Sequence, residues 1–324
     1  MVAQSADPRA ASWSAAKGGS NVWQGLVRLA RPMQLAIWTG STLALGLAAA
    51  PGFRSGWFLA LVMVAVGGIA LQGYITHGLN DLYDWESGTD QVTPGTISGG
   101  SHVMREGLMD VRRISETVMV ALAAYVVLLG ALALWRGPIF WLLGLVALAA
   151  GIGYSFPPFR LCYRPLMGEW LGIFPAMTAG VIAAGLAVSG RVTPALLMIG
   201  ILQGIICNAS VMEHHLVDID SDWAAHPPKR TSPAFWQRAL GRPGAEVAAG
   251  YQLTAALLGA VAGVFVSPRF WWSTVVGVLG AILALGTHQG DVADETRRDY
   301  WLKMLGVVHA LGYVAMALGG IGVL

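Results

Sequence analysis

Long runs of apolar residues alternate with short polar segments along the whole chain. Each run is close to the length of about 20 apolar residues that a helix needs to cross the hydrocarbon core of a bilayer. The pattern predicts an all-α integral membrane protein with nine transmembrane helices. The predicted spans are 33–50, 57–79, 114–135, 138–155, 169–189, 194–216, 245–267, 270–288 and 301–324.

The composition excludes an ordinary water-soluble domain. Hydrophobic residues make up 55% of the chain and charged residues only 12%, whereas a soluble globular domain carries about 25% charged residues. The polar surface is therefore too small to cover a soluble core of this size. We divide the chain into a flexible N-terminal tail at 1–32 and a single transmembrane domain at 33–324.

The basic residues are segregated between the two sets of loops. Sixteen of the 20 lysine and arginine residues fall on one side of the predicted spans, and the other side holds only Arg54, Arg136, Arg191 and Arg269. Cytoplasmic loops of membrane proteins carry the excess of positive charge. The charge pattern predicts a multi-pass protein of the cell membrane, with the N terminus and the long loops at 80–113 and 217–244 in the cytoplasm.

The first cluster of acids lies at the cytoplasmic end of the second span. Asp81 and Asp84 are three residues apart, so they share one face of a helix. Asn80 lies on their membrane side, and Asp90 follows Gly88, where we expect the helix to break.

A second cluster of acids lies at the cytoplasmic end of the sixth span. Asp218 and Asp222 are four residues apart and are predicted to share a helical face, while Asp220 points elsewhere. Acids at the mouth of an apolar bundle are costly and need partners.

Paired carboxylates of this kind suit Mg²⁺, which proteins hold with one or two carboxylates together with substrate phosphates. We expect Asp81, Asp84, Asp218 and Asp222 to be catalytic and, with Asp90, to hold the metal. Magnesium ions on a diphosphate would make it a good leaving group. The predicted diphosphate-binding residues are Asn80, Arg105, Arg160, Lys229 and Arg230.

Other interpretations of these residues remain open. The acids could be solvated loop carboxylates that offset loop arginines, although two such motifs at two helix ends argue against this. His214 and His215 could ligate a transition metal with Asp218, but no further nitrogen or sulfur donor is evident. Asp291 and Asp294 also mimic a metal pair, and their charge-rich neighbourhood favours a solvated cluster.

Three ordered motifs resemble the UbiA-type membrane prenyltransferases. Asn80-Asp81-x-x-Asp84 with Asp90 is similar to the first aspartate motif of that superfamily, and Asp218-x-x-x-Asp222 with Lys229-Arg230-Thr231 to the second. The stretch 153–169 resembles the segment after the fourth helix of the family. The gap to Asp90 and the Ser98-Gly99-Gly100-Ser101 run are similar to the 1,4-dihydroxy-2-naphthoate prenyltransferase branch.

This resemblance implies nine transmembrane helices around a central cavity, with both motifs on the cytoplasmic side. It also implies Mg²⁺-dependent transfer of a prenyl group from an isoprenyl diphosphate to an aromatic acceptor, such as a hydroxynaphthoate or a hydroxyarene. Such a reaction serves menaquinone and other quinone or prenylated-metabolite biosynthesis. The expected partners are the diphosphate, the acceptor and the lipid bilayer, and no nucleic acid.

His214 and His215 depart from the family pattern, since quinone branches carry Asn and an acidic or amide residue there. We therefore expect the acceptor pocket to include His77, Tyr154, His214 and His215. Two alternatives stay open: a terpene cyclase of the same superfamily, which would quench the allylic cation internally, and a polytopic transporter. Transporters place charges or broken helices near the bilayer midplane, whereas the acids here gather at one end of the spans.

Overall fold

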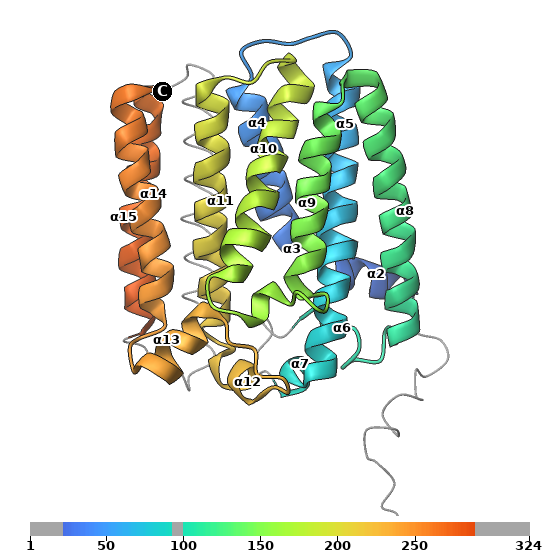
Figure 1. The fold of residues 1–324 in the computed structure, drawn as a ribbon, viewed down its shortest axis with the longest axis vertical. Helices are drawn as coiled ribbons and strands as arrows, with labels where there is room; N and C mark the ends of the chain where they lie inside the picture. The colour runs from blue at the N-terminus through green and yellow to red at the C-terminus, as the bar shows by residue number, and fades with distance from the viewer. Residues whose placement is uncertain (1–21, 93–99, 289–324) are drawn as a thin grey trace, which may run out of the picture.

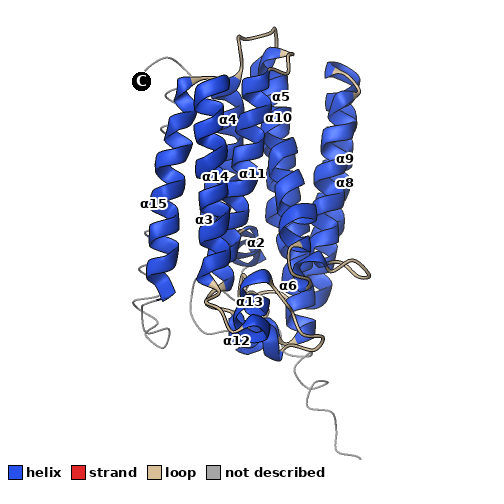
Figure 2. Ribbon diagram, turned by 60° about the vertical axis from the view of Figure 1, so that its left-hand side comes forward, coloured by secondary structure: helices blue, strands red, loops and turns tan. Residues whose placement is uncertain are grey.

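The computed structural model describes residues 22–92 and 100–288, and every regular element within them is a helix. Figure 1 shows the long helices standing side by side, with α7 (Thr89–Val92), α12 (Ile219–Ala224) and α13 (Ser232–Leu240) gathered at one end. Figure 2 shows α12 and α13 at that same end after rotation. The acidic motifs predicted from the sequence belong to this end of the bundle.

The bundle is built from eight rods of helix within the described residues. The rods are α3–η1–α4 (Pro32–Leu35, Ala36–Gly40 and Ser41–Ala49), α5–η2–α6 (Trp57–Gly68, Ile69–Thr76 and His77–Ser87), α8 (Val111–Arg136), α9 (Ile139–Ser155), η4–α10 (Gly168–Ile173 and Phe174–Ser189), α11 (Pro194–His215), α14 (Ala245–Phe265) and η5–α15 (Pro268–Phe270 and Trp271–His288). Two further short helices are α2 (Val22–Ala30) and η3 (Leu161–Tyr163).

Six helices in the described part of the chain are long and apolar enough to cross a membrane. These are Trp57–Ser87, Val111–Arg136, Gly168–Ser189, Pro194–His215, Ala245–Phe265 and Pro268–Gly286. They correspond to six of the predicted spans. The predicted span 138–155 is an apolar but shorter helix, 33–50 is the α3–η1–α4 rod, and 301–324 lies outside the described residues. The protein is therefore a multi-pass membrane protein, and the number nine stays a prediction.

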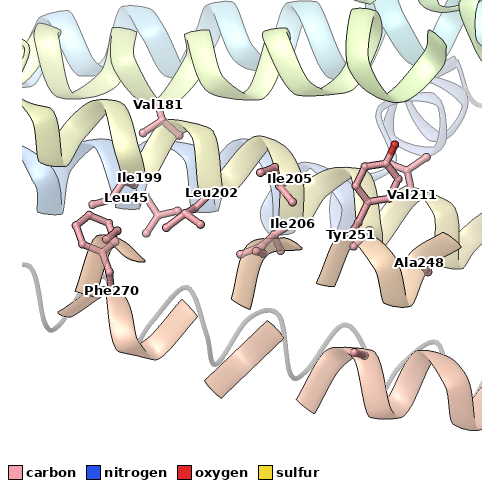
Figure 3. Close-up of a cluster of buried hydrophobic side chains, with 14 of the residues drawn as sticks. Leu45, Val181, Ile199, Leu202, Ile205, Ile206, Val211, Ala248, Tyr251 and Phe270 are labelled. Carbon is pink, nitrogen blue, oxygen red and sulfur yellow. The ribbon is translucent and has the colours of Figure 1, made fainter. Parts of the chain in front are cut away.

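Helix α11 is the centre of the larger apolar core. It packs against α10 on one side and α14 on the other, and 78% of its apolar window is buried inside the protein. Figure 3 shows Leu202, Ile205 and Ile206 of α11 within this cluster. A Cβ atom on Gly204 would come within 2.7 Å of the Phe174 ring on α10, so glycine lets these two helices approach closely.

Three of the rods contain a π-helical stretch, and each stretch lies beside one cavity. The stretches are η1, η2 and η4, which contribute Trp38, Gln72 and Ile173 to the cavity lining. Short π-helical segments inside α-helices occur frequently at functional sites, because the wider turn redirects side chains. The irregular backbone therefore marks the part of the bundle where we place the site.

The segment before the first rod also contributes to this end of the bundle. Residues 22–30, which the sequence assigns to the tail, form α2, and Leu29 is fully buried there. A Cβ atom on Gly25 would come within 2.7 Å of Met109, so α2 packs closely on the loop that precedes α8. This packing brings Arg31 next to the first aspartate motif.

Candidate active site

Asp81 lies one helical turn before Asp84 on α6, and its side chain is buried. Its carboxylate forms an ion pair with the guanidinium group of Arg31. The backbone N–H of Ser101 lies 3.3 Å from each carboxylate oxygen, and the Ser101 hydroxyl donates a further hydrogen bond. Asp81 is therefore fixed by groups that come from two other parts of the chain.

Asp84 is held equally firmly, but by different partners. Lys229 Nζ lies 2.6 Å from Asp84 Oδ2, and Asn80 Nδ2 donates to the same oxygen at 2.8 Å. The Tyr163 hydroxyl lies 2.9 Å from Asp84 Oδ1 and also 2.9 Å from Ser87 Oγ. Because all these groups are buried or nearly so, the carboxylate keeps one orientation.

Asp90 follows on α7 and faces the same space. Its neighbour Gly100 has a φ of 79°, and a Cβ atom there would collide with the Asp90 carboxylate. Glycine is thus required at this position for both backbone conformation and space. Burial, together with the nearby Asp84 and Asp81 charges, raises the pKa of Asp90 well above its usual range.

The second motif does not continue the sixth span. Helix α11 ends at His215, and Asp218 is the N-cap residue of the separate helix α12. Both aspartates therefore lie beyond the predicted span 194–216, on a short helix of their own. The two residues still stand one turn apart, because the backbone N–H of Asp222 donates to the carbonyl of Asp218 at 2.7 Å.

Asp222 is fully buried, while Asp220 points to the surface. The Thr231 hydroxyl donates to Asp222 Oδ2 at 3.2 Å, and His215 Nδ1 lies 3.3 Å from that oxygen. Oδ1 of Asp222 accepts no hydrogen bond from the described residues. The Asp220 side chain is 82% exposed and pairs with Arg238, so the predicted difference in direction between Asp220 and Asp222 is present.

Lys229 joins the two motifs. Its ammonium group lies 2.6 Å from Asp84 and 3.8 Å from Asp222 Oδ1, and the side chain is only 4% exposed. Burial works against the charged form, but the carboxylates of Asp84 and Asp222 outweigh it and hold the pKa of Lys229 well above its usual value. A permanent positive charge therefore sits between the motifs.

Both motifs stand at one end of a cavity of about 250 Å³ that extends deep into the bundle. Its polar end is lined by Arg31, Asn80, Asp84, Asp90, His77, Tyr154, His214, His215, Asp218 and Lys229. Its other end is apolar and is lined mainly by residues of α5, α8, α9 and α10. A ligand with a charged head and a hydrocarbon tail matches this division.

The residues predicted to hold the acceptor all line the polar end. His215 Nε2 lies 3.5 Å from the Tyr154 hydroxyl, so its two ring nitrogens face Tyr154 and Asp222. His214 Nδ1 lies 2.7 Å from the carbonyl of Ser210, and the His214 ring meets Trp38 edge to face at 6.2 Å. His77 lies against the carbonyls of Leu29 and Ala30.

Three of the predicted diphosphate-binding residues do not line the cavity in the part of the chain that the structure describes. Arg105 is exposed and lies 3.1 Å from His102 Nδ1, and Arg230 is exposed over the ring of Trp223. Arg160 pairs with Glu86 at 3.3 Å. Only Asn80 and Lys229 of that set reach the site; Asp291 and Asp294 lie outside the described residues.

Sequence reasoning missed three residues of the site. Arg31, Ser101 and Tyr163 bind the first motif directly, but they lie 50, 20 and 79 residues away from their partners in the chain. Arg31 falls in the segment 1–32 that the sequence assigns to the N-terminal tail. The available signals were the Arg31-Pro32 step at the mouth of the first span and the glycine-serine run that ends at Ser101.

The aspartates of the two motifs suit a Mg²⁺ ion that takes some of its ligands from the protein and the others from the substrate. Among residues 22–92 and 100–288, no three His, Cys, Asp or Glu side chains converge to hold a metal alone. Mg²⁺ usually takes only one or two carboxylates and completes its shell with water and phosphate oxygens. Oδ1 of Asp222, buried and without a hydrogen bond from those residues, is one oxygen that could serve.

The fold and the cavity define a multi-pass membrane protein with a buried polar site. The model of the UbiA prenyltransferase family matches residues 38–311, so the chain belongs to that family and is a prenyltransferase. No curated protein sequence matches the chain.

Solved structures of family members share the fold at low sequence identity. A UbiA homologue from Archaeoglobus fulgidus bound to GPP and Mg²⁺ is 18% identical, with a TM-score of 0.66 over 92% of this chain and 99% of that one. An apo homologue from Aeropyrum pernix K1 is 16% identical, with a TM-score of 0.59 over 87% and 98% of the two chains. A digeranylgeranylglyceryl phosphate synthase is 11% identical, with a TM-score of 0.59 over 93% and 99%.

Proposed function

We propose that this protein transfers a prenyl group from an isoprenyl diphosphate to an aromatic acceptor, with Mg²⁺ as the required metal. The observation that carries the proposal is the meeting of Asp84 and Asp222 on either side of Lys229, at the polar mouth of an apolar cavity. A diphosphate would lie at the mouth and its hydrocarbon tail in the cavity. The homologue from Archaeoglobus fulgidus, bound to GPP or to DMAPP with Mg²⁺, supports this class of substrate.

The chain supplies positive and negative groups for different parts of the diphosphate. Asp81, Asp84, Asp90, Asp218 and Asp222 would hold Mg²⁺, which when bound neutralises charge on the departing diphosphate. Lys229 and Arg31 line the same space and can bind phosphate oxygens that the metal leaves free. Arg31 pairs with Asp81 and Lys229 pairs with Asp84. The site therefore holds basic and acidic side chains next to each other without any substrate.

The reaction is proposed to proceed by ionisation of the allylic diphosphate and not through a protein nucleophile. Burial raises the pKa of the Cys162 thiol to about 12, so this thiol stays protonated at neutral pH. The Ser101 hydroxyl is engaged with Asp81. The chain therefore has no activated nucleophile among these groups, and an electron-rich ring placed beside the cation suffices to capture it.

We place the acceptor beside His214, His215, Tyr154 and His77, with a hydroxynaphthoate or a related hydroxyarene as the expected class. His215 and Tyr154 both line the cavity, with His215 Nε2 3.5 Å from the Tyr154 hydroxyl, and such groups suit phenolic or carboxylate substituents. A His214→Asn, His215→Asn double variant should keep prenyl diphosphate binding and change acceptor affinity. Loss of diphosphate binding in that variant would assign the histidines to the metal site.

The direct experiment uses purified protein in lipid nanodiscs with labelled geranylgeranyl diphosphate, Mg²⁺ and a panel of hydroxyarenes. A prenylated ring is the expected product, and its formation should stop when EDTA removes the metal. The same incubation without acceptor separates the cyclase alternative, because a cyclase would release a hydrocarbon whereas a transferase leaves the diphosphate intact. An unreacted diphosphate with every acceptor would overturn the aromatic class.

We also propose that the end of the bundle that carries the two aspartate motifs faces the cytoplasm. The support is the charge segregation, with Arg54, Arg136, Arg191 and Arg269 as the basic residues of the opposite side. Single cysteines at 95 and 230 should react with an impermeant thiol reagent only after the membrane is opened. Labelling of either position from outside intact cells would reverse the orientation.

A further inference from the structure

The imidazole ring of His214 is held by two contacts. Its Nδ1 lies 2.7 Å from the backbone carbonyl of Ser210, one turn earlier on α11. A carbonyl oxygen can only accept a hydrogen bond, so Nδ1 is the nitrogen that carries the proton. The ring also meets the indole of Trp38 on η1 edge to face, with the ring centroids 6.2 Å apart. The side chain is therefore fixed between its own helix and the first rod.

The second ring nitrogen of His214 keeps a lone pair. In the neutral ring only one nitrogen bears hydrogen, so Nε2 can accept a hydrogen bond but cannot donate one. None of the hydrogen bonds of His214 to residues 22–92 and 100–288 uses Nε2. His214 is half-buried and lines the polar end of the cavity. Because Nδ1 is turned to the backbone of α11, the tip of the ring offers Nε2 to a ligand as an acceptor.

The adjacent His215 differs in this respect. Its Nδ1 lies 3.3 Å from Asp222 Oδ2, and its Nε2 lies 3.5 Å from the Tyr154 hydroxyl. Both nitrogens of His215 thus already face a protein group. Of these two histidines, His214 is the one with a ring nitrogen left for a ligand in the described part of the chain.

A lone pair at this place distinguishes between the substituents of an aromatic acceptor. A hydroxyl group can donate its hydrogen to Nε2, whereas a carboxylate or an ether oxygen has no hydrogen to donate. Sites that bind a substrate hydroxyl by a hydrogen bond also reject analogues that lack it, because the polar group of the protein is then left unpaired.

We propose that His214 selects acceptors with a free hydroxyl group, by accepting a hydrogen bond from that hydroxyl at Nε2. The inference rests on the proposed function, since it concerns the acceptor of the same reaction. It also gives the acceptor an orientation, with its hydroxyl directed to His214 and the Trp38 ring beside it. A carboxylate on the same acceptor then lies elsewhere in the pocket.

The test measures binding of three probes to the full chain in lipid nanodiscs, with Mg²⁺ and geranylgeranyl S-thiolodiphosphate, a donor analogue that resists turnover. The probes are 4-hydroxy-2-naphthoate, its methyl ether and 2-naphthoate, which share the ring and the carboxylate. Wild type should bind the hydroxyl compound about tenfold or more tightly than either of the others, as expected for a hydrogen bond to an otherwise unpaired group.

The decisive variant is His214→Phe, which keeps an aromatic ring beside Trp38 and has no nitrogen. The three Kd values should then agree within about twofold, because no acceptor for the hydroxyl remains. His214→Met also lacks a ring nitrogen and provides the same test if the phenylalanine variant does not fold.

Two further variants isolate the effect. His214→Gln offers an amide oxygen as the acceptor, so it should keep a preference for the hydroxyl compound over the methyl ether. A glutamine variant without any preference would show that the shape of the ring, and not its lone pair, is recognised. Leu197→Ala changes a side chain of the same helix that is 43% exposed and does not line the cavity, and it should leave the wild-type preference unchanged.

The outcomes separate the inference from the function beneath it. If wild type does not bind the donor analogue, or binds it but none of the three naphthoates, the proposed function fails. If wild type binds the three naphthoates equally, or if His214→Phe keeps the wild-type preference, His214 does not select the hydroxyl. The proposed donor and the aromatic class of acceptor would then stand unaltered.

Discussion

The two aspartate motifs use the same side chain, but the chain positions them by different means. Asp81 and Asp84 lie on a helix that runs unbroken from Trp57 to Ser87. Asp218 and Asp222 lie beyond the end of α11, on the short helix α12. The first motif takes its geometry from a transmembrane helix, whereas the second takes it from a folded loop.

That loop is tied to the first motif through its backbone. The N–H of His226 donates to the carbonyl of Ser87 at 2.9 Å, at the end of the helix that carries Asp84. The N–H of Lys229 donates to the carbonyl of Asp222 at 2.8 Å. The second motif is therefore positioned partly by the first, and the two form a single site despite the distance between them in sequence.

Removing a carboxylate from either motif is expected to have the largest effect. Asp84→Asn and Asp222→Asn should each lower kcat/KM by about a thousandfold, because charge stabilisation by a metal is worth several kcal/mol. Asp81→Asn and Asp218→Asn are expected to behave alike. Steady-state assays with the prenyl donor at saturating Mg²⁺ measure this.

The matched control is Asp220→Asn, which changes an exposed carboxylate between Asp218 and Asp222 that pairs only with Arg238 among the described residues. Its kcat/KM should remain close to wild type. If Asp220→Asn lowered kcat/KM as much as Asp222→Asn does, the face of α12 that carries Asp222 would not be the one that faces the site.

Lys229 tests whether the two motifs depend on one another. In Lys229→Met, two buried carboxylates lose their shared cation, and breaking a buried pair costs about 3–5 kcal/mol. The melting temperature in EDTA should fall sharply, and Mg²⁺ should restore part of it by replacing the lost charge. Thermal unfolding in detergent, with and without Mg²⁺, measures both.

Arg230→Met is the control for this variant, since Arg230 is the exposed neighbour that stacks on Trp223. Its effect should stay within about 0.5 kcal/mol, as for most surface substitutions. If Lys229→Met melts like wild type in EDTA, the lysine does not couple the motifs.

The same contrast explains what could be predicted from the sequence. The apolar blocks fixed the long helices closely, as with 194–216 against Pro194–His215, because a backbone in hydrocarbon must satisfy its polar groups within a helix. The shared face of Asp81 and Asp84 could be predicted as well, because both residues belong to such a helix. The expected break at Gly88 is also present, with a φ of 90°.

The second motif could not be placed in this way. The end of α11 was predicted to within one residue, but α12, which carries Asp222, is only six residues long and too short to show an apolar block of its own. The N–H groups of His226 and Lys229 bind the carbonyls of Ser87 and Asp222, and helical spacing does not predict such contacts. Arg105 and Arg230 follow the motifs in sequence but do not line the cavity, whereas the structure brings Arg31 to Asp81 from another part of the chain.

The groups behind the carboxylates should have intermediate effects that differ between the motifs. Tyr163→Phe removes a hydroxyl 2.9 Å from Asp84 Oδ1 and should weaken Mg²⁺ activation about tenfold, as is usual for partners of metal ligands. Thr231→Val removes the longer bond of 3.2 Å to Asp222 and should do less. The Mg²⁺ concentration for half-maximal activity measures both, and equal effects would contradict the distinction.

Asp90 gives the smallest expected effect, and it is seen as a change of slope with pH. Burial and the charges of Asp84 and Asp81 raise the pKa of Asp90, so the folded protein holds this proton at pH values where the unfolded chain has lost it. Stability is then fully present below the ordinary pKa of 3.8 and is lost as pH rises toward the folded value. Asp90→Asn removes this component, so its melting temperature in EDTA should decline less with rising pH than that of wild type. Asp220→Asn, with an exposed carboxylate, should keep the wild-type slope. Parallel slopes for wild type and Asp90→Asn would show that Asp90 ionises in the folded protein as easily as in the unfolded chain.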